Sequence, residues 1–110
     1  YGPGWIEVNG QRFTSSLIVS SLAGSSPLVW DAARFEDLSP LDFEVLAQSG
    51  AELVLFGSGQ RLRFPQPAWF ASLIQKGIGM ETMGTPAACR TYNILASEGR
   101  KVVVALLLEA

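Results

Sequence analysis

The fold class of this chain is decided by the stretch Glu52-Leu53-Val54-Leu55-Phe56, which is followed directly by Gly57-Ser58-Gly59. Four consecutive apolar residues with glycines after them are typical of a short strand that is covered on both faces. Such strands lie inside parallel or mixed sheets, where helices connect neighbouring strands. The stretch therefore predicts an α/β fold.

Helices and strands alternate in the sequence after this strand. A second helix is expected to begin at residues 65–67, where two prolines stand, and to end before Gly77. A strand follows over 77–82, a third helix over 85–97 and a last strand over 100–108. The apolar stripe of the second helix carries Trp69, Phe70, Leu73 and Ile74. The order of elements predicts a right-handed parallel crossover for at least the first pair of strands.

The N-terminal third predicts antiparallel strands. Residues 5–8 alternate between apolar and polar, and Asn9-Gly10 follows them. Because Asn-Gly suits the two positive-φ positions of a type I′ turn, a hairpin into residues 11–13 is expected. Further strands are expected at 17–19 and 28–30, separated by a loop of small residues.

A first helix is expected to start after Ser39. Ser39 can cap the helix, Pro40 suits its first turn, and the Asp42 carboxylate can complete a capping box. Gly50 supplies the stop. The face expected to be buried carries Leu41, Val45 and Leu46.

These elements predict one layered α/β domain over residues 1–110. Its expected centre is a mixed, largely parallel sheet, with helices packed on it and an N-terminal β-hairpin layer. The length suits a single domain, and 48% hydrophobic with 16% charged residues predicts a folded chain with a substantial core.

Composition also excludes several classes of function. The net charge of −2 and the lack of a basic cluster disfavour nucleic-acid binding. The chain has no histidine and one cysteine, which removes imidazole-based catalysis and argues against a structural zinc site. No catalytic residue, metal or cofactor is therefore predicted.

The apolar run over 102–108 is too short to span a bilayer, so no integral membrane segment is expected. The chain begins at Tyr1 rather than at methionine, which leaves a targeting segment upstream as an open alternative.

One corner of the predicted sheet could bind a ligand. The loops over 57–61 and 83–86 leave the carboxyl ends of two strands and should be adjacent. Gly57, Gly59, Arg61 and Thr85 are the candidates for a small anion site beside the start of the third helix. The alternative is that the glycines form a tight turn, Thr85 only caps the helix, and Arg61 is solvated.

The third helix carries a second group of candidates. Cys89 lies near its positive end, where a thiolate is favoured, although simple packing in the core is the stronger interpretation. Arg90, Tyr92 and Asn93 could form a recognition face, or Tyr92 could pack its ring while Arg90 stays on the surface.

Three segments of the second half carry a resemblance to a known family: Gly57-Ser58-Gly59-Gln60-Arg61, Gly77-Ile78-Gly79-Met80-Glu81, and Thr85 through Asn93 continuing to Arg100. They resemble a small α/β domain family of unassigned molecular function, which includes the mitochondrial NADH:ubiquinone oxidoreductase complex assembly factor three. The resemblance implies a central mixed sheet, with helices on one side and a hairpin-bearing β layer on the other. It implies no catalytic mechanism, so Cys89, Arg90, Tyr92 and Asn93 enter as motif positions only.

The first interpretation is a non-enzymatic interaction or assembly domain, with a protein partner and a role near a membrane-associated respiratory complex. The alternative is a small-ligand or anion-binding protein, or a minor enzyme, with its site at loops 57–61 and 83–90. The expected compartment is the cytoplasm for a bacterial or archaeal chain and the mitochondrion for a eukaryotic one. Weak self-association stays an open alternative.

Overall fold

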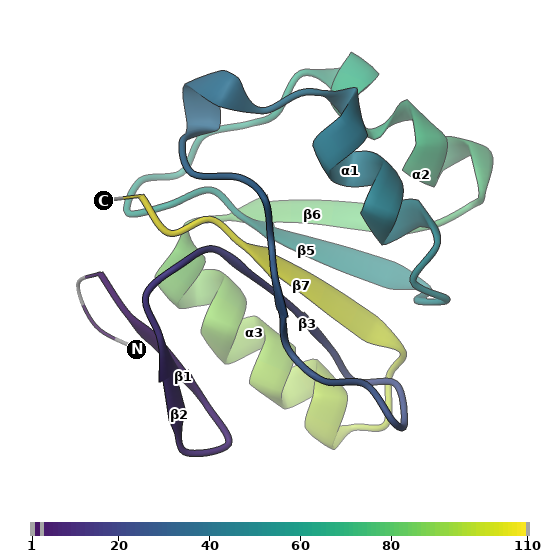
Figure 1. Cartoon of the computed structure of the whole chain (residues 1–110). Coiled ribbons are helices and arrows are strands. Elements are labelled where there is room, and N and C mark those ends of the chain that lie inside the picture. The colour runs from purple at the N-terminus through teal and green to yellow at the C-terminus, as the bar shows by residue number, and fades with distance from the viewer. Residues whose placement is uncertain (1, 3, 110) are drawn as a thin grey trace.

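The computed structural model describes residues 2 and 4–109, and its centre is a five-stranded mixed sheet (Figure 1). The strands follow the order β4-β3-β7-β5-β6. β5 is parallel to both β6 and β7, whereas β3 is antiparallel to β7 and β4. Their bounds are β3 (Leu17–Ser20), β4 (Leu28–Val29), β5 (Leu53–Gly57), β6 (Gly79–Met83) and β7 (Val102–Leu106). The predicted mixed, largely parallel sheet is thereby confirmed.

The sheet separates two apolar layers. Along β7 every residue is buried, and alternate side chains point to opposite faces. Val103 and Ala105 pack in one layer with Val54 and Phe56, whereas Val104 packs in the other layer. A strand that is apolar at every position is therefore required here, as the continuous run indicates.

Helices cover both faces of the sheet, and the resemblance had implied helices on one face only. α1 (Pro40–Ala47), α2 (Ala71–Gln75) and the short 3₁₀ helices η1 (Phe35–Asp37) and η2 (Pro67–Phe70) lie on one side. α3 (Thr85–Ser97) lies on the other side with the hairpin of β1 (Ile6–Val8) and β2 (Gln11–Phe13) (Figure 1).

The topology explains why α2 and α3 lie on opposite faces. The chain moves outward along the sheet from β5 to β6, and then back past β5 to β7. Parallel crossovers are right-handed, so two crossovers in opposite directions place their helices on opposite faces.

The hairpin turn has the predicted geometry. Asn9 and Gly10 have φ angles of 52° and 81°, and Val8 pairs with Gln11 across the turn. Two positive φ values in succession are what a type I′ turn requires.

α1 begins as predicted but buries a different face. The Asp42 carboxylate accepts a hydrogen bond from the Ser39 N–H at 2.9 Å, which confirms the capping box. The buried residues are Phe43, Leu46 and Ala47, whereas Leu41 and Val45 are 73% and 49% exposed. Apolar residues occur on every side of this helix, so their spacing does not select a face, and the packing of Phe43 on the sheet does.

The second helix is shorter than predicted, because its first turn is the 3₁₀ helix η2 and only residues 71–75 are α-helical. Leu73 is fully buried, but Ile74 of the predicted stripe is 62% exposed. Of the α-helical residues 71–75, only Leu73 is therefore buried in the core.

Candidate functional site

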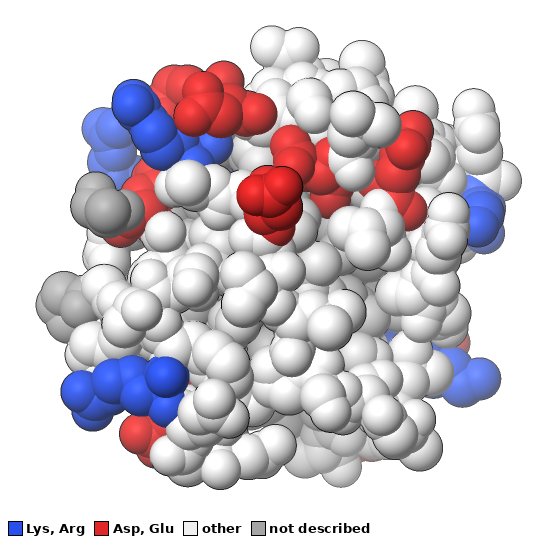
Figure 2. All heavy atoms as spheres, viewed as in Figure 1, with Lys and Arg blue, Asp and Glu red and all other residues white. Residues whose placement is uncertain are grey.

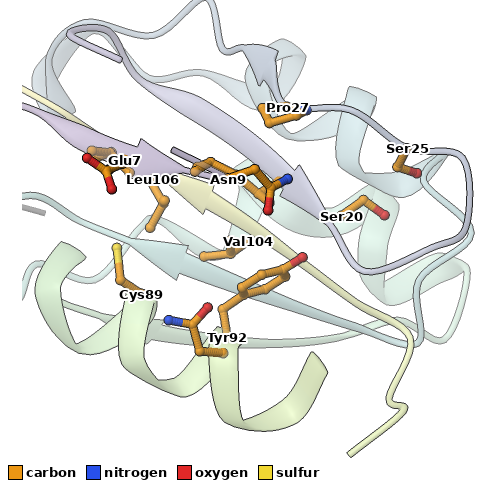
Figure 3. A pocket seen from close by; sticks show the side chains of 13 residues that line it. Glu7, Asn9, Ser20, Ser25, Pro27, Cys89, Tyr92, Val104 and Leu106 are labelled. Atoms are coloured by element: carbon orange, nitrogen blue, oxygen red, sulfur yellow. The ribbon is translucent and has the colours of Figure 1, made fainter. Parts of the chain in front are cut away.

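A cleft of about 240 Å³ lies between the N-terminal hairpin and α3 (Figure 3). Val19, Val104 and Leu106 from β3 and β7 supply an apolar floor, whereas the hairpin and the loop after β3 contribute polar groups. The polar or thiol-bearing residues that line it are Glu7, Asn9, Ser20, Ser25, Cys89, Tyr92 and Asn93. The cleft is large enough for a small molecule or for a few side chains of a partner.

The structure brings together three of the four motif residues predicted on the third helix. Cys89, Tyr92 and Asn93 are spaced by three and four residues, so they share one face of α3 and line the cleft. Figure 3 shows Cys89 and Tyr92 on the side of α3 that faces Glu7 and Asn9. Arg90 is exposed and is not among the lining residues.

Both ionisable side chains of α3 in the cleft are neutral at pH 7. Burial raises the pKa of the Cys89 thiol, although the Arg90 guanidinium favours the thiolate. Burial raises the pKa of the Tyr92 phenol as well. Because the thiolate is the nucleophile, this environment suppresses the reactivity that a helix start alone would give Cys89.

We expect Cys89 to react slowly with iodoacetamide in the folded chain. At pH 8 its alkylation should be at least about tenfold slower than in the same chain unfolded in urea, because folding lowers both access and the thiolate fraction. The rate should still rise with pH above about 8.5, the ordinary thiol pKa. The alkylation rate is measured by intact-protein mass spectrometry. Equal rates in the folded and unfolded chain would contradict the burial of the Cys89 thiol.

The predicted corner at loops 57–61 and 83–86 is held by hydrogen bonds within the chain. The Thr85 hydroxyl accepts a hydrogen bond from the Gly59 N–H at 2.9 Å and donates one to the Leu107 carbonyl at 2.8 Å. The Thr85 N–H in turn donates to the Gly59 carbonyl at 2.7 Å. Gly84, not Thr85, occupies the cap position of α3, so Thr85 joins three segments instead of capping a helix.

Little room for an anion is left at this corner. A Cβ at Gly57 would lie 3.0 Å from the Thr85 hydroxyl oxygen, which shows how closely the two loops approach. The cavity beside Gly59 and Thr85 has a volume of about 20 Å³, which suffices for about one water molecule. Arg61 is exposed. The anion site of Gly57, Gly59, Arg61 and Thr85 stays a prediction, with the amides of Gly59 and Thr85 already engaged.

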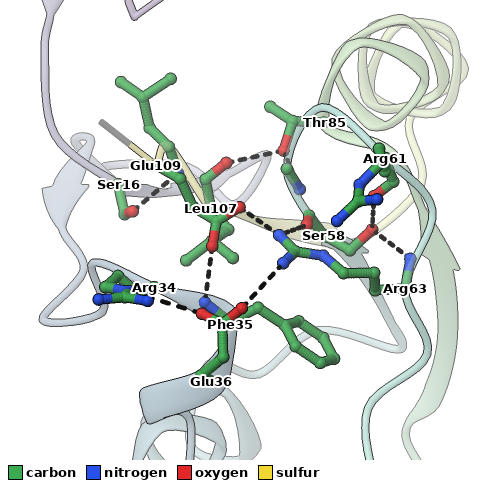
Figure 4. A network of polar contacts seen from close by, with 12 residues as sticks. Ser16, Arg34, Phe35, Glu36, Ser58, Arg61, Arg63, Thr85, Leu107 and Glu109 are labelled. Atoms are coloured by element: carbon green, nitrogen blue, oxygen red, sulfur yellow. Dashed lines mark hydrogen bonds and ion pairs between the residues drawn. The ribbon is translucent and has the colours of Figure 1, made fainter.

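Arg63, rather than Arg61, is built into this corner (Figure 4). Its guanidinium pairs with Glu109, donates to the Ser58 carbonyl at 2.8 Å and lies 4.6 Å from the centre of the Phe35 ring. It also lies 3.6 Å from Glu36. The spacing of residues could not reveal this network, because Glu109 is 46 positions away from Arg63.

Glu109 fastens the C-terminal segment to η1. Burial by itself raises the pKa of its carboxyl, but the Phe35 N–H at 2.9 Å and the Arg63 guanidinium stabilise the carboxylate more strongly. The net pKa therefore lies below its usual value. A carboxyl of this kind stabilises the fold above its unfolded-state pKa, and that stability is lost as the pH falls through the folded-state pKa.

We expect Glu109→Gln to lower the free energy of unfolding by about 1–2 kcal/mol at pH 7, since charge-assisted hydrogen bonds are lost. The difference from the parent chain should shrink between about pH 5 and pH 3, as the parent carboxylate is protonated. Urea titrations at several pH values measure the unfolding free energies of both chains. Glu81→Gln, at an exposed position of β6, is the control. If the stability difference stayed constant down to pH 3, the ionised Glu109 carboxylate would not be what stabilises this segment.

Apolar side chains also remain exposed along the edge of the sheet next to α1. Leu28 and Val29 of β4 are 57% and 66% exposed, close to the exposed Leu41 and Val45 of α1. Sequence reasoning missed this surface, because it assigned Leu41 and Val45 to the core. The signal that could have found it is the excess of apolar residues in α1 over what one buried face needs.

Two features of the described residues, 2 and 4–109, bear on the class of site. None of the helices in that part of the chain is both long and apolar enough to cross a membrane. Within the same residues, no three histidine, cysteine, aspartate or glutamate side chains gather in a way that could hold a metal ion.

The fold defines a class of small layered α/β domain. An NMR structure of a Bordetella pertussis protein described as an Mth938-like domain matches it with a TM-score of 0.85, at 32% identity over 98% of this chain and 82% of the other. A crystal structure of a Bordetella parapertussis protein matches with a TM-score of 0.90, at 38% identity over 98% of this chain and 91% of the other. The Mth938-like fold is therefore that of this chain.

The chain belongs to the family described as Protein of unknown function (DUF498/DUF598), whose model matches residues 1–107. Among curated relatives, NADH dehydrogenase (ubiquinone) 1 alpha subcomplex assembly factor 3 of Bos taurus is 31% identical over 102 residues. That match covers 91% of this chain and 54% of the bovine protein, so the chain spans about half the length of this relative. The resemblance inferred from the sequence is confirmed.

Proposed function

We propose that this chain is a protein-interaction domain that assists the assembly of a membrane-associated respiratory complex and catalyses no reaction itself. The observation that carries the proposal is the exposed apolar surface of β4 and α1, since exposed apolar patches of this kind mark interaction sites. The relation to a named assembly factor over 91% of the chain supports it. The proposal places a bacterial chain in the cytoplasm and a eukaryotic one in the mitochondrion.

The chemistry of the hairpin–α3 cleft agrees with a binding role. Its thiol and phenol are neutral at pH 7, and neither is paired there with a base that would activate it among the described lining residues. A partly apolar cleft whose α3 side chains are neutral can hold a side chain or a small molecule without chemical conversion.

Deletion of the gene in the native host tests the proposal. The amount of one assembled respiratory complex, resolved on native gels and quantified by mass spectrometry, is expected to fall several-fold and to return with a plasmid copy. A tagged chain should co-purify with subunits of that complex after mild crosslinking. Unchanged levels of every respiratory complex, together with no enriched membrane-complex subunit, would refute the assembly role.

A second candidate is a small-ligand protein, which the 240 Å³ cleft favours. For this candidate function, the ligand would lie on Val104 and Leu106 and contact Cys89 and Tyr92. It would not bind at the corner of Gly57, where little room is left. A ligand screen read by NMR shifts of Cys89 and Tyr92 tests it, and absence of shifts at millimolar concentration would eliminate it.

A further inference from the structure

A continuous groove runs between the edge of the sheet and α1. Two neighbouring hollows, of about 490 and 380 Å³, form it and share the lining residues Ile18, Leu28 and Val45. The second hollow extends to Leu41 and Trp30. We call this surface the β4–α1 groove.

The walls of the β4–α1 groove are held in place from inside the protein. The Trp30 indole N–H donates to the Asp42 carbonyl at 3.0 Å, which ties the end of β4 to α1. The same indole packs edge-on against Phe43 and Phe56, with ring centres 6.0 Å apart in both pairs. A groove that exists before binding requires little ordering when a partner docks.

The groove carries negative charge only. Asp31 and Asp42 line it, and no lysine or arginine does so among the described residues. The segment 31–44, which runs from Asp31 into the first half of α1, holds five acidic residues and one arginine, a net charge of −4. The other residues, five acidic and seven basic, carry a net charge of +2. Figure 2 shows acidic side chains over the upper part of this face and an uncharged area below them.

We propose that the β4–α1 groove binds an apolar segment of a partner protein that carries lysine or arginine residues beside its apolar ones. This inference rests on the proposed function and deepens it, because it assigns the surface and the chemistry of the partner. The apolar side chains pack on Leu28, Leu41 and Val45, and the basic ones approach Asp31 and the acids of segment 31–44. Opposite charges around an apolar centre give both orientation and specificity.

A second copy of this chain is a poor occupant. Two β4–α1 grooves facing each other would bring together two segments that each carry a net charge of −4. Like charges placed opposite one another disfavour such a contact. The charge distribution therefore selects a different protein.

The test places a photo-crosslinking amino acid at position 45 of the full chain in the native host. The matched control carries it at position 94, since Ile94 is 58% exposed and lies on α3, on the other side of the sheet. Mass spectrometry then reads the sequence of the captured segment. We expect position 45, and not position 94, to capture a segment with apolar residues next to lysine or arginine.

Binding of the captured segment as a synthetic peptide gives the second readout. Val45→Glu should weaken its affinity about tenfold or more, which is the usual effect of removing an interface hot spot. Ile94→Glu should leave the affinity unchanged. Both substitutions are at exposed helical positions, so thermal melting of the two variants should match the parent chain. Leu41→Glu serves as a second groove variant.

Two results would overturn the inference while leaving the proposed function intact. One is co-purification of a respiratory complex without any capture from position 45. The other is capture of an acidic segment, or of one that binds the Val45→Glu variant as well as the parent chain. Failure of the complex to co-purify at all would count against the proposed function itself.

Discussion

Replacing Phe56 with alanine is expected to lower the free energy of unfolding by about 3–5 kcal/mol, the usual cost of removing a buried aromatic ring. A domain of this size has a total stability of about 5–15 kcal/mol, so the variant should lose a large share of it. Urea titration followed by tryptophan fluorescence measures the change.

The large loss of stability expected for Phe56→Ala follows from the aromatic cluster between the sheet and the helices. Phe56 is fully buried in the central strand β5. Its ring centre lies 5.5 Å from that of Phe43 and 6.0 Å from that of Trp30, both in edge-on arrangements. Phe35 packs on it from η1 at 6.4 Å. The cavity left by alanine would therefore open where β5, β4, α1 and η1 meet.

Phe64→Ala is the matched control. Phe64 is 72% exposed, so removal of the same ring should change stability by less than about 0.5 kcal/mol. If both variants lost the same stability, the cluster would not be the centre of the core.

Thr85→Val is expected to have the second-largest effect, a loss of about 2–4 kcal/mol. The two side chains have nearly the same shape, so no cavity is created. Valine, however, leaves the Gly59 N–H and the Leu107 carbonyl without their partner in a buried site. Each buried polar group that loses its hydrogen bond costs about 1–3 kcal/mol.

Thr85→Ser separates the hydroxyl from the methyl group. Serine keeps both hydrogen bonds and loses one methyl, so its cost should be about 1 kcal/mol. Amide hydrogen exchange at Gly59 should accelerate in the valine variant and stay slow in the serine variant. A serine variant as unstable as the valine variant would show that packing, not hydrogen bonding, holds this corner.

Local patterns in the sequence determined much of the fold. The apolar run over 53–56 lies in the central strand β5, and Asn9-Gly10 formed the predicted turn. The bounds of the third helix, residues 85–97, agree with the prediction. Each of these features depends on residues within a few positions of one another, where backbone preference and turn chemistry act directly.

Local sequence patterns predict only part of the candidate functional site. The sequence singled out Cys89, Tyr92 and Asn93 as motif positions of the third helix, and the structure shows that all three line a cleft. The opposite wall comes from the hairpin about 80 positions earlier, which no local pattern could bring there. Glu7 and Asn9 were therefore not recognised as neighbours of Cys89.

Tertiary structure decided what depends on distant partners. Phe43 selected the buried face of α1 and left Leu41 and Val45 in solvent, because the aromatic rings of β5 and Trp30 give it a place in the core. Arg63, not Arg61, entered the polar network because Glu109 reaches it from the end of the chain. The helices, the strands and the class of fold could be predicted from the sequence, since they follow from local periodicity and turns. Only packing decided which apolar and charged side chains remain available for a partner, because burial is settled by contacts between segments far apart in the chain.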